Sequence, residues 1–268
     1  MNRRSDGAMI LIVEAENSDI LLGCADELTG RIRFENRISA DLKRTAVEYS
    51  ILIKQILELN GINAADITGG IIASCVPGLT DTLKSAMAKL LHIGVLEVGP
   101  GIKTGVDIRI DDPGELGADL IAAAAAGIAE YGAPLVIINL CTLTTLSVID
   151  EKKHFIGAVF QPGLRLSAEA IGQRTANLPD IAIRRSEKLI GTNTVESIQS
   201  GIINGCSASI DGLLDRIEHE LDHPELLPVI TGEHAQIVAA GCRHHMLVDG
   251  HLIIKGLISI YNKNKRSR

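Results

Sequence analysis

Residues 9–24 read MILIVEAENSDILLGC, and residues 135–149 read LVIINLCTLTTLSVI. Each segment is an apolar run, a short hinge with polar or hydroxyl side chains, and a second apolar run. Short apolar runs bounded by polar turn residues are typical of buried strands. The two segments therefore predict that each half of the chain begins with a strand, a hinge and a returning strand. In the first half the hinge is expected to run from Glu14 to Asp19.

Helical patterns follow both strand pairs. Apolar residues recur at helical spacing from Thr45 to Leu59, and Asn60-Gly61 provides a helix-ending signal. Residues 99–117 are rich in Gly, Pro and Asp and are expected to form a loop around one short strand. The other expected strands are 69–75, 95–98, 155–160 and 229–231, and the other expected helices are 79–91, 118–131, 167–174, 194–221 and 252–262.

The pattern predicts an α/β protein in which a unit of mixed sheet plus helices is duplicated, with a ligand at the seam. A chain of 268 residues has room for two such lobes. We expect an N-terminal lobe at residues 9–124 and a C-terminal lobe at residues 125–268.

Composition narrows the functional classes. The formal net charge is −7, whereas a nucleic-acid-binding surface needs a basic balance, so no nucleic-acid partner is expected. No apolar run reaches the roughly 18–20 residues that a membrane span requires, so no membrane partner is expected. The five cysteines are widely spaced, without a CxxC pair, and this favours reduced thiols in a cytoplasmic protein.

Several short blocks occur in order along the chain. Their sequences and spacing resemble the type III pantothenate kinase family, and the resemblance covers essentially the whole chain from Met9. The blocks are Arg44-Thr-Ala-Val-Glu-Tyr49, Gly99-Pro-Gly-Ile-Lys-Thr-Gly105, Gly117-Ala-Asp119, Gln161-Pro-Gly163 with Ser167-Ala-Glu-Ala170, Asn177-Leu-Pro179, Gly191-Thr-Asn-Thr194 and Gln199-Ser-Gly201.

This resemblance implies the fold of the actin and sugar-kinase superfamily, in which two ribonuclease-H-like lobes hold ATP and substrate between them, generally in a dimer. It implies phosphorylation of pantothenate, the first step toward coenzyme A. It also implies magnesium and a monovalent cation, potassium or ammonium, as cofactors beside ATP.

The resemblance also implies roles for individual residues. Asp119 matches the catalytic base of the family, within the substrate-binding block that Gly117 and Ala118 begin. Thr194 matches a residue that contacts pantothenate. From the residues alone, Asp119 could instead be a helix N-cap, and Thr194 could cap the helix that begins there.

The first phosphate loop departs from the family pattern Asp-x-Gly-Asn-Thr. Glu14 stands at the metal position, and Glu16 replaces a glycine that lets phosphate approach the backbone. Glu16 also adds a negative charge beside a polyanion. Asn17 and Ser18 still provide polar groups for ATP.

The second phosphate loop, Asp-x-Gly-Thr in the family, retains Thr142 for ATP but has Asn139 at the cation position. Because both positions that would hold a metal or cation are substituted, no complete set of protein metal ligands is expected. Three further substitutions lie in blocks that contact ligands: Leu120 for an arginine, Ile110 for an aromatic residue and Glu233 for a glycine.

Two hypotheses follow. The first is a pantothenate kinase homologue with weak or partner-dependent activity, binding pantothenate or a related small molecule. The second is a non-catalytic subunit or regulator that pairs with an intact family member. The expected assembly is a homodimer or a hetero-oligomer with such an intact family member. His244-His245 is interpreted as a loop pair rather than a metal site.

Overall fold

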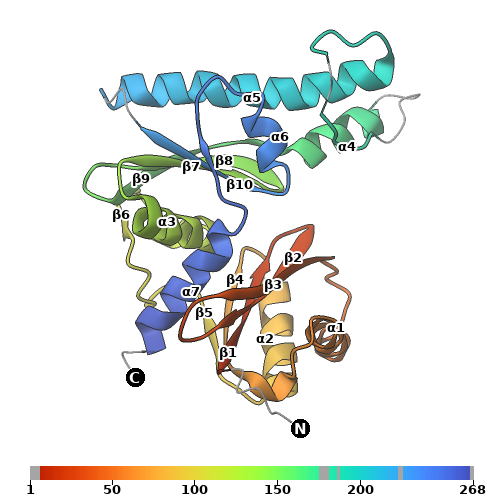
Figure 1. Cartoon of the computed structure of the whole chain (residues 1–268), viewed down its shortest axis with the longest axis vertical. Coiled ribbons are helices and arrows are strands. Elements are labelled where there is room, and N and C mark those ends of the chain that lie inside the picture. Colours follow the sequence, from red (N-terminus) through yellow and green to blue (C-terminus); the bar gives the residue numbers. More distant parts are fainter. Residues whose placement is uncertain (1–6, 175–180, 186–187, 223–225, 266–268) are drawn as a thin grey trace. The chain divides into compact units, whose positions relative to one another are not determined.

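The computed structural model describes residues 7–174, 181–185, 188–222 and 226–265. The Asn177–Pro179 block lies outside these ranges. The chain forms two compact units (Figure 1). Unit 1 comprises residues 1–106, 111–126 and 252–268, and unit 2 comprises residues 107–110 and 127–251.

Unit 1 contains a five-stranded mixed sheet in the order β3-β2-β1-β4-β5. The first three strands are antiparallel neighbours, and β4 and β5 extend the sheet in parallel. Alternate residues of a strand face opposite sides of a sheet. The strands are β1 (Met9–Ala15), β2 (Asp19–Asp26), β3 (Ile32–Ser39), β4 (Ile67–Ser74) and β5 (Val95–Glu97).

One face of this sheet is covered by α1 (Ala46–Leu59) and α2 (Pro77–Leu91). The β1 residues that pack on this side are Met9, Leu11, Val13 and Ala15. The even-numbered β1 residues, Glu14 among them, therefore face the other side of the sheet.

A capping box fixes the start of α1, because the Thr45 hydroxyl accepts from the backbone N–H of Glu48 and the Glu48 carboxylate accepts from the backbone N–H of Thr45.

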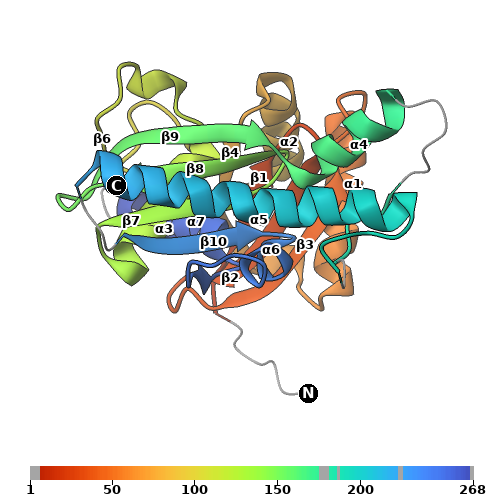
Figure 2. The same ribbon diagram turned by 90° about the horizontal axis from the view of Figure 1, so that it is seen from above.

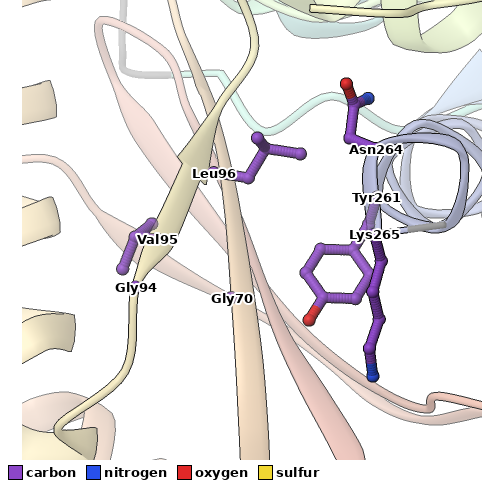
Figure 3. A pocket seen from close by; sticks show the side chains of 7 residues that line it. All are labelled: Gly70, Gly94, Val95, Leu96, Tyr261, Asn264 and Lys265. Carbon is purple, nitrogen blue, oxygen red and sulfur yellow. The ribbon is translucent and has the colours of Figure 1, made fainter. Parts of the chain in front are cut away.

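The other face of the sheet receives α7 (Leu252–Lys265), which contacts β1 and β4. Towards its end, a cavity of ≈130 Å³ remains between the helix and the strands (Figure 3). Tyr261, Asn264 and Lys265 line it from α7, opposite residues 70 and 94–96 of β4, β5 and the segment before β5. The C-terminal helix thus belongs to unit 1 by its contacts.

Unit 2 repeats the strand order of unit 1. Its sheet runs β11-β10-β7-β8-β9-β6, with β7, β8 and β9 antiparallel and β10 parallel to β7. The duplicated mixed sheet expected from the sequence is confirmed, with β6 as an additional edge strand. The strands are β6 (Asp107–Ile108), β7 (Leu135–Leu140), β8 (Leu143–Ile149), β9 (His154–Pro162), β10 (Leu227–Gly232) and β11 (Leu247–Val248).

Three helices cover one face of this sheet. Figure 2 shows the longest, α5 (Thr194–Glu220), lying lengthwise over the strands. With α4 (Leu164–Arg174) and α6 (Ala235–Ala239) it buries Val136, Ile138 and Leu146. The helix α3 (Ala118–Tyr131) begins in unit 1 and ends in unit 2. Among the described helices, none is long and apolar enough to span a membrane.

One sequence prediction about the strands was wrong, and one edge strand of the first sheet was missed. Glu14 and Ala15 belong to β1, where Glu14 pairs with Leu21 and Ala73, so the first hinge begins at Glu16 rather than at Glu14. The edge strand β3 was not predicted, because its residues are mostly charged or polar and only Phe34 is buried.

The division into lobes at residues 124 and 125 stays a prediction. The compact units differ from it at the C-terminus, because the apolar side of α7 packs on the first sheet rather than the second.

Candidate active site

Three carboxylates gather on the face of the first sheet that lies away from α1 and α2. Glu14 is the sixth residue of β1, and Glu16 follows the end of that strand. Asp119 is the second residue of α3. The charges of Glu16 and Asp119 act on Glu14, and the charge of Glu16 acts on Asp119, so the three form one acidic cluster within unit 1.

Glu14 is the most deeply buried member of the acidic cluster. It is 1% exposed, and neither of its carboxylate oxygens has a hydrogen-bond partner among the described residues. Burial raises the pKa of Glu14 well above its ordinary value, and the charges of Glu16 and Asp119 raise it further. The guanidinium of Arg37, two strands away on β3, partly offsets these effects.

The surroundings of Asp119 suit a catalytic base, because they raise the pKa of its carboxyl group. Burial raises the pKa of Asp119, and the Glu16 carboxylate adds to the rise, while the backbone N–H groups of Leu120 and Asp119 itself act against it. A carboxylate with a raised pKa is a stronger proton acceptor near neutral pH. Because α3 begins at Ala118, Asp119 lies inside the first turn and does not occupy the N-cap position.

The loop after β1 is a tight turn closed by the Glu16 N–H, which donates to the Asp19 carbonyl at 2.9 Å. Asn17 is exposed, with its amide 4.0 Å from the thiol of Cys75. The Ser18 hydroxyl donates to Asp19 at 2.8 Å. The structure therefore places two of the three residues assigned to ATP, Asn17 and Ser18, on one turn beside the acidic cluster.

Cys75, which follows β4, was not singled out from the sequence. Burial raises the pKa of its thiol to about 11, with further contributions from Asp119, Glu16 and Glu14. The thiol therefore stays protonated near neutral pH, and part of the rise in its pKa comes from the negative charges of the cluster. No sequence signal pointed to it, since it reaches the cluster only through the pairing of β1 with β4.

In unit 2 the second candidate phosphate loop is the turn between β7 and β8. Asn139 is 1% exposed and accepts a hydrogen bond from the thiol of Cys141 at 2.9 Å. The backbone N–H of Gly163 donates to the carbonyl of Thr142 at 3.2 Å. A Cβ at Gly163 would lie 2.3 Å from the Cys141 oxygen, so only glycine permits this approach.

Thr194 is exposed at the first position of α5. The helix is capped by Asn193, whose side-chain oxygen accepts from the Glu196 N–H at 3.0 Å. The sequence-based alternative that Thr194 caps the helix is therefore wrong. Thr194 and Thr142 lie in unit 2, whereas Gly117, Ala118 and Asp119 lie in unit 1.

A second polar cluster surrounds His244. Burial alone would raise the pKa of Asp211, but hydrogen bonds from the backbone N–H groups of Arg243 and His244 and from the His244 imidazole lower it. The ring nitrogens of His244 lie 3.0 Å from Asp211 and 3.3 Å from Asp215. Glu218 lies within ligand spacing of His244 and Asp215, but Arg243 already pairs with Asp215 at 3.0 Å. These contacts support a structural role for the cluster.

We expect Asp211→Ala to lower the free energy of unfolding by about 2–3 kcal/mol, because two part-buried backbone donors and an imidazole lose a charged acceptor. Urea unfolding at pH 7 provides the measurement. The matched control on the same helix is Asp215→Ala, which removes a half-exposed ion pair and should cost less than about 1 kcal/mol. Equal losses in the two variants would refute the structural role of Asp211.

The fold and the acidic cluster define the class of protein. Two sheets with the same mixed strand order, each covered by helices, have the fold of two ribonuclease-H-like lobes, as the sequence predicts. The structure resembles the activator of 2-hydroxyisocaproyl-CoA dehydratase from Clostridium difficile with bound ADPNP, at a TM-score of 0.56 and 11% identity over 97% of each chain. A Campylobacter jejuni protein whose description assigns it to the Baf family of transcriptional activators gives a TM-score of 0.60 and 17% identity, over 96% of this chain and 99% of the other.

At these identities the structural likeness concerns the fold alone. Sequence comparison is more specific. The type III pantothenate kinase family model matches residues 10–216. A type III pantothenate kinase from Bacillus cytotoxicus is 39% identical over 256 residues, which covers 96% of this chain and 97% of the relative. The chain belongs to the type III pantothenate kinase family.

Proposed function

We propose that this protein transfers the γ-phosphoryl group of ATP to pantothenate, with Asp119 as the base. The observation that carries the proposal is the position of Asp119, a largely buried carboxylate of raised pKa at the start of α3, in a chain that matches the family over nearly its whole length. Gly117 and Ala118, which lead into α3, are assigned to substrate binding. Thr194 is assigned to contact pantothenate.

In the proposed reaction, the Asp119 carboxylate accepts the proton of the pantothenate hydroxyl as the hydroxyl oxygen attacks the γ-phosphorus. The bond between the γ-phosphorus and the bridging oxygen breaks, and ADP leaves. Phosphoryl transfer depends mainly on positioning and charge stabilisation. Asn17, Ser18 and Thr142 are the residues that we assign to the phosphates of ATP.

A divalent cation fits the acidic cluster. The two oxygens of Glu14 are buried without a hydrogen-bond partner among the described residues, and carboxylate oxygens are the ligands that Mg²⁺ prefers. Glu14 and Glu16 would hold the ion, which when bound neutralises phosphate charge. For the monovalent cation, potassium or ammonium, Asn139 offers an amide oxygen that already accepts from Cys141.

We further propose that turnover is slow. Glu16 is 6% exposed and brings a second carboxylate beside Glu14, so ATP must approach a negative surface unless cations neutralise it. The same observation favours the alternative of a non-catalytic subunit that pairs with an intact family member.

A homodimer is the simplest assembly for the active protein, and the cytoplasm is its expected location.

The test is an assay of pantothenate-dependent ADP formation by the purified protein with Mg²⁺ and K⁺. We expect turnover below about 1 s⁻¹, the lower end of common enzyme rates. Rates well above this value would refute the slow-turnover proposal. No product, together with a stable mixed oligomer with an intact family member, would replace the kinase proposal by the partner role.

A further inference from the structure

The edge strand β6 joins the second sheet from within a long loop. Residues 107–110 belong to unit 2, whereas the residues on both sides of them belong to unit 1. Figure 1 shows β6 beside β9, at the edge of the sheet. The loop then continues through the 3₁₀ helix Pro113–Glu115 to α3, which carries Asp119. The attachment of β6 therefore helps to fix the course of the segment that leads to the candidate base.

The strand β6 makes few backbone contacts. It is two residues long, with Asp107 beside His154 and Ile108 beside Phe155. The Arg109 N–H donates one further hydrogen bond to the Phe155 carbonyl at 2.8 Å. Asp107 is exposed and Ile108 is only partly buried. Because so short a strand gains little from pairing and burial, side-chain contacts are needed to keep it on the sheet.

His154 provides such a contact, because its imidazole lies between two carboxylates. Its Nδ1 lies 2.9 Å from Oδ2 of Asp150, and its Nε2 lies 3.4 Å from Oδ2 of Asp107. Asp150 follows β8, and its Oδ1 accepts from the backbone N–H groups of Lys152 and His154 at 2.9 and 2.8 Å. Asp150 therefore fixes the orientation of the ring, so that Nε2 faces Asp107 on β6.

The contacts of His154 use both ring nitrogens. Carboxylates accept hydrogen bonds but do not donate them, so the imidazolium form satisfies both contacts at once. Burial acts to raise the pKa of Asp150, but hydrogen bonds from the His154 backbone and ring, together with the His154 charge, lower it below its ordinary value. Arg109 also pairs with Asp107, at 2.8 Å, but both residues belong to the β6 segment. Arg109 therefore balances charge, whereas His154 connects the two strands.

We propose that His154 is a positioning residue for pantothenate binding, which ties β6 to β9 and so holds the loop that runs from Ile110 to residues 117–119. The inference rests on the proposed function for the identity of the ligand. Nearer its start, the same loop is held by Asn264 of α7, whose side-chain amide exchanges two hydrogen bonds with the backbone of Lys103, at 3.1 and 3.0 Å. Side chains from outside the loop thus hold it at two places ahead of the candidate base.

The decisive variant is Asp107→Asn, because it removes the charge that faces His154 from β6 and leaves the Asp150 contact intact. Without the bridge, β6 should leave the sheet more often. We expect hydrogen exchange of the Arg109 amide to be about tenfold faster and KM for pantothenate to be about tenfold higher, the factor that one hydrogen bond to a charged group provides. The turnover number and KM for ATP should change by less than about twofold. A variant that was only partly folded would instead lower the turnover number and leave KM unaltered.

His154→Leu removes the other side of the bridge and should have the same effects. The double variant should be little worse than either single variant, because both changes remove one contact. The control His245→Leu replaces an exposed histidine of unit 2 and should retain the wild-type exchange rate and KM. Wild-type exchange of the Arg109 amide in Asp107→Asn would overturn the bridge. Faster exchange with an unchanged KM for pantothenate would overturn the positioning role.

Calorimetric titration with pantothenate separates this inference from the proposed function. Suppose that the wild type binds pantothenate about tenfold more tightly than Asp107→Asn does but phosphorylates none of it. This result would support the inference and refute the proposed function. Phosphorylation with equal KM values in the wild type and Asp107→Asn would do the reverse. A wild type that neither binds nor phosphorylates pantothenate would refute both.

Discussion

Asp119→Asn is expected to lower the turnover number for pantothenate phosphorylation by about 10²–10⁴-fold, the range that a general base contributes. Asparagine has the shape of aspartate and can still accept a hydrogen bond through its oxygen, but it cannot take the hydroxyl proton. The measurement is a steady-state assay of wild type and variant at saturating pantothenate and ATP.

The variant also separates catalysis from binding. Asp119→Asn removes one charge from the acidic cluster, so ATP should meet less repulsion. We therefore expect an unchanged or lower KM for ATP together with the lower turnover number. A variant that only disturbed the fold would raise KM instead.

The control for this prediction is Asp81→Asn, an exposed aspartate of α2 in the same unit, which should retain the wild-type rate. Retention of more than about a third of the wild-type rate by Asp119→Asn would exclude Asp119 as the base. In that case its raised pKa would reflect only its burial beside Glu16.

Much of the fold could be predicted from local pattern. The apolar runs at residues 9–13 and 135–140 are buried strands, and the capping residues at Thr45 and Asn60 do bound a helix. These features depend on neighbours in the sequence, where periodicity and capping chemistry act directly. The repeat of strand order in the two units followed from the repeat of the apolar pattern.

The parts that could not be predicted depend on tertiary contacts. The apolar residues of α7 predict a helix that covers a sheet, but they do not say which sheet, and the chain returns it to the first unit. Similarly, β3 is an edge strand whose stability comes from pairing with β2 rather than from burial. Local sequence carries little information about either outcome.

The same distinction applies to the candidate site. Family blocks led to Asp119, Asn17 and Ser18, and their assigned roles remain predictions. The sequence also identified Glu16 as a charge that phosphate must meet. It could not show that Glu14 is buried without hydrogen bonds, because that depends on which face of the sheet the side chain takes and on what covers that face.

A large stability effect is expected for Gly256→Ala in α7. A Cβ at this position would lie 1.8 Å from the carbonyl oxygen of Ala122 and 3.0 Å from its Cα. These are backbone atoms, so a side-chain rotation cannot relieve the overlap, and α7 or α3 must move. We expect a loss of about 2–3 kcal/mol in the free energy of unfolding, measured by urea denaturation.

The alanine run of α3 explains why the two helices approach so closely. Residues 122–126 are all alanine and at most 3% exposed. Because an alanine side chain is a single methyl group, a neighbouring element can approach the α3 backbone closely. Glycine at position 256 completes the contact from the α7 side. A larger side chain at position 256 should lower the free energy of unfolding further, so Gly256→Val should destabilise the protein more than Gly256→Ala.

The matched control is Gly78→Ala, at an exposed position of α2 where a Cβ would meet no atom within 4 Å. Alanine is the better helix former, so this change should leave stability unaltered or raise it by up to about 1 kcal/mol. Equal unfolding midpoints for Gly256→Ala and the wild type would contradict the close contact between α3 and α7. Because Asp119 lies in the first turn of α3, a true displacement of these helices should also lower the kinase rate, although residue 256 itself takes no part in the chemistry.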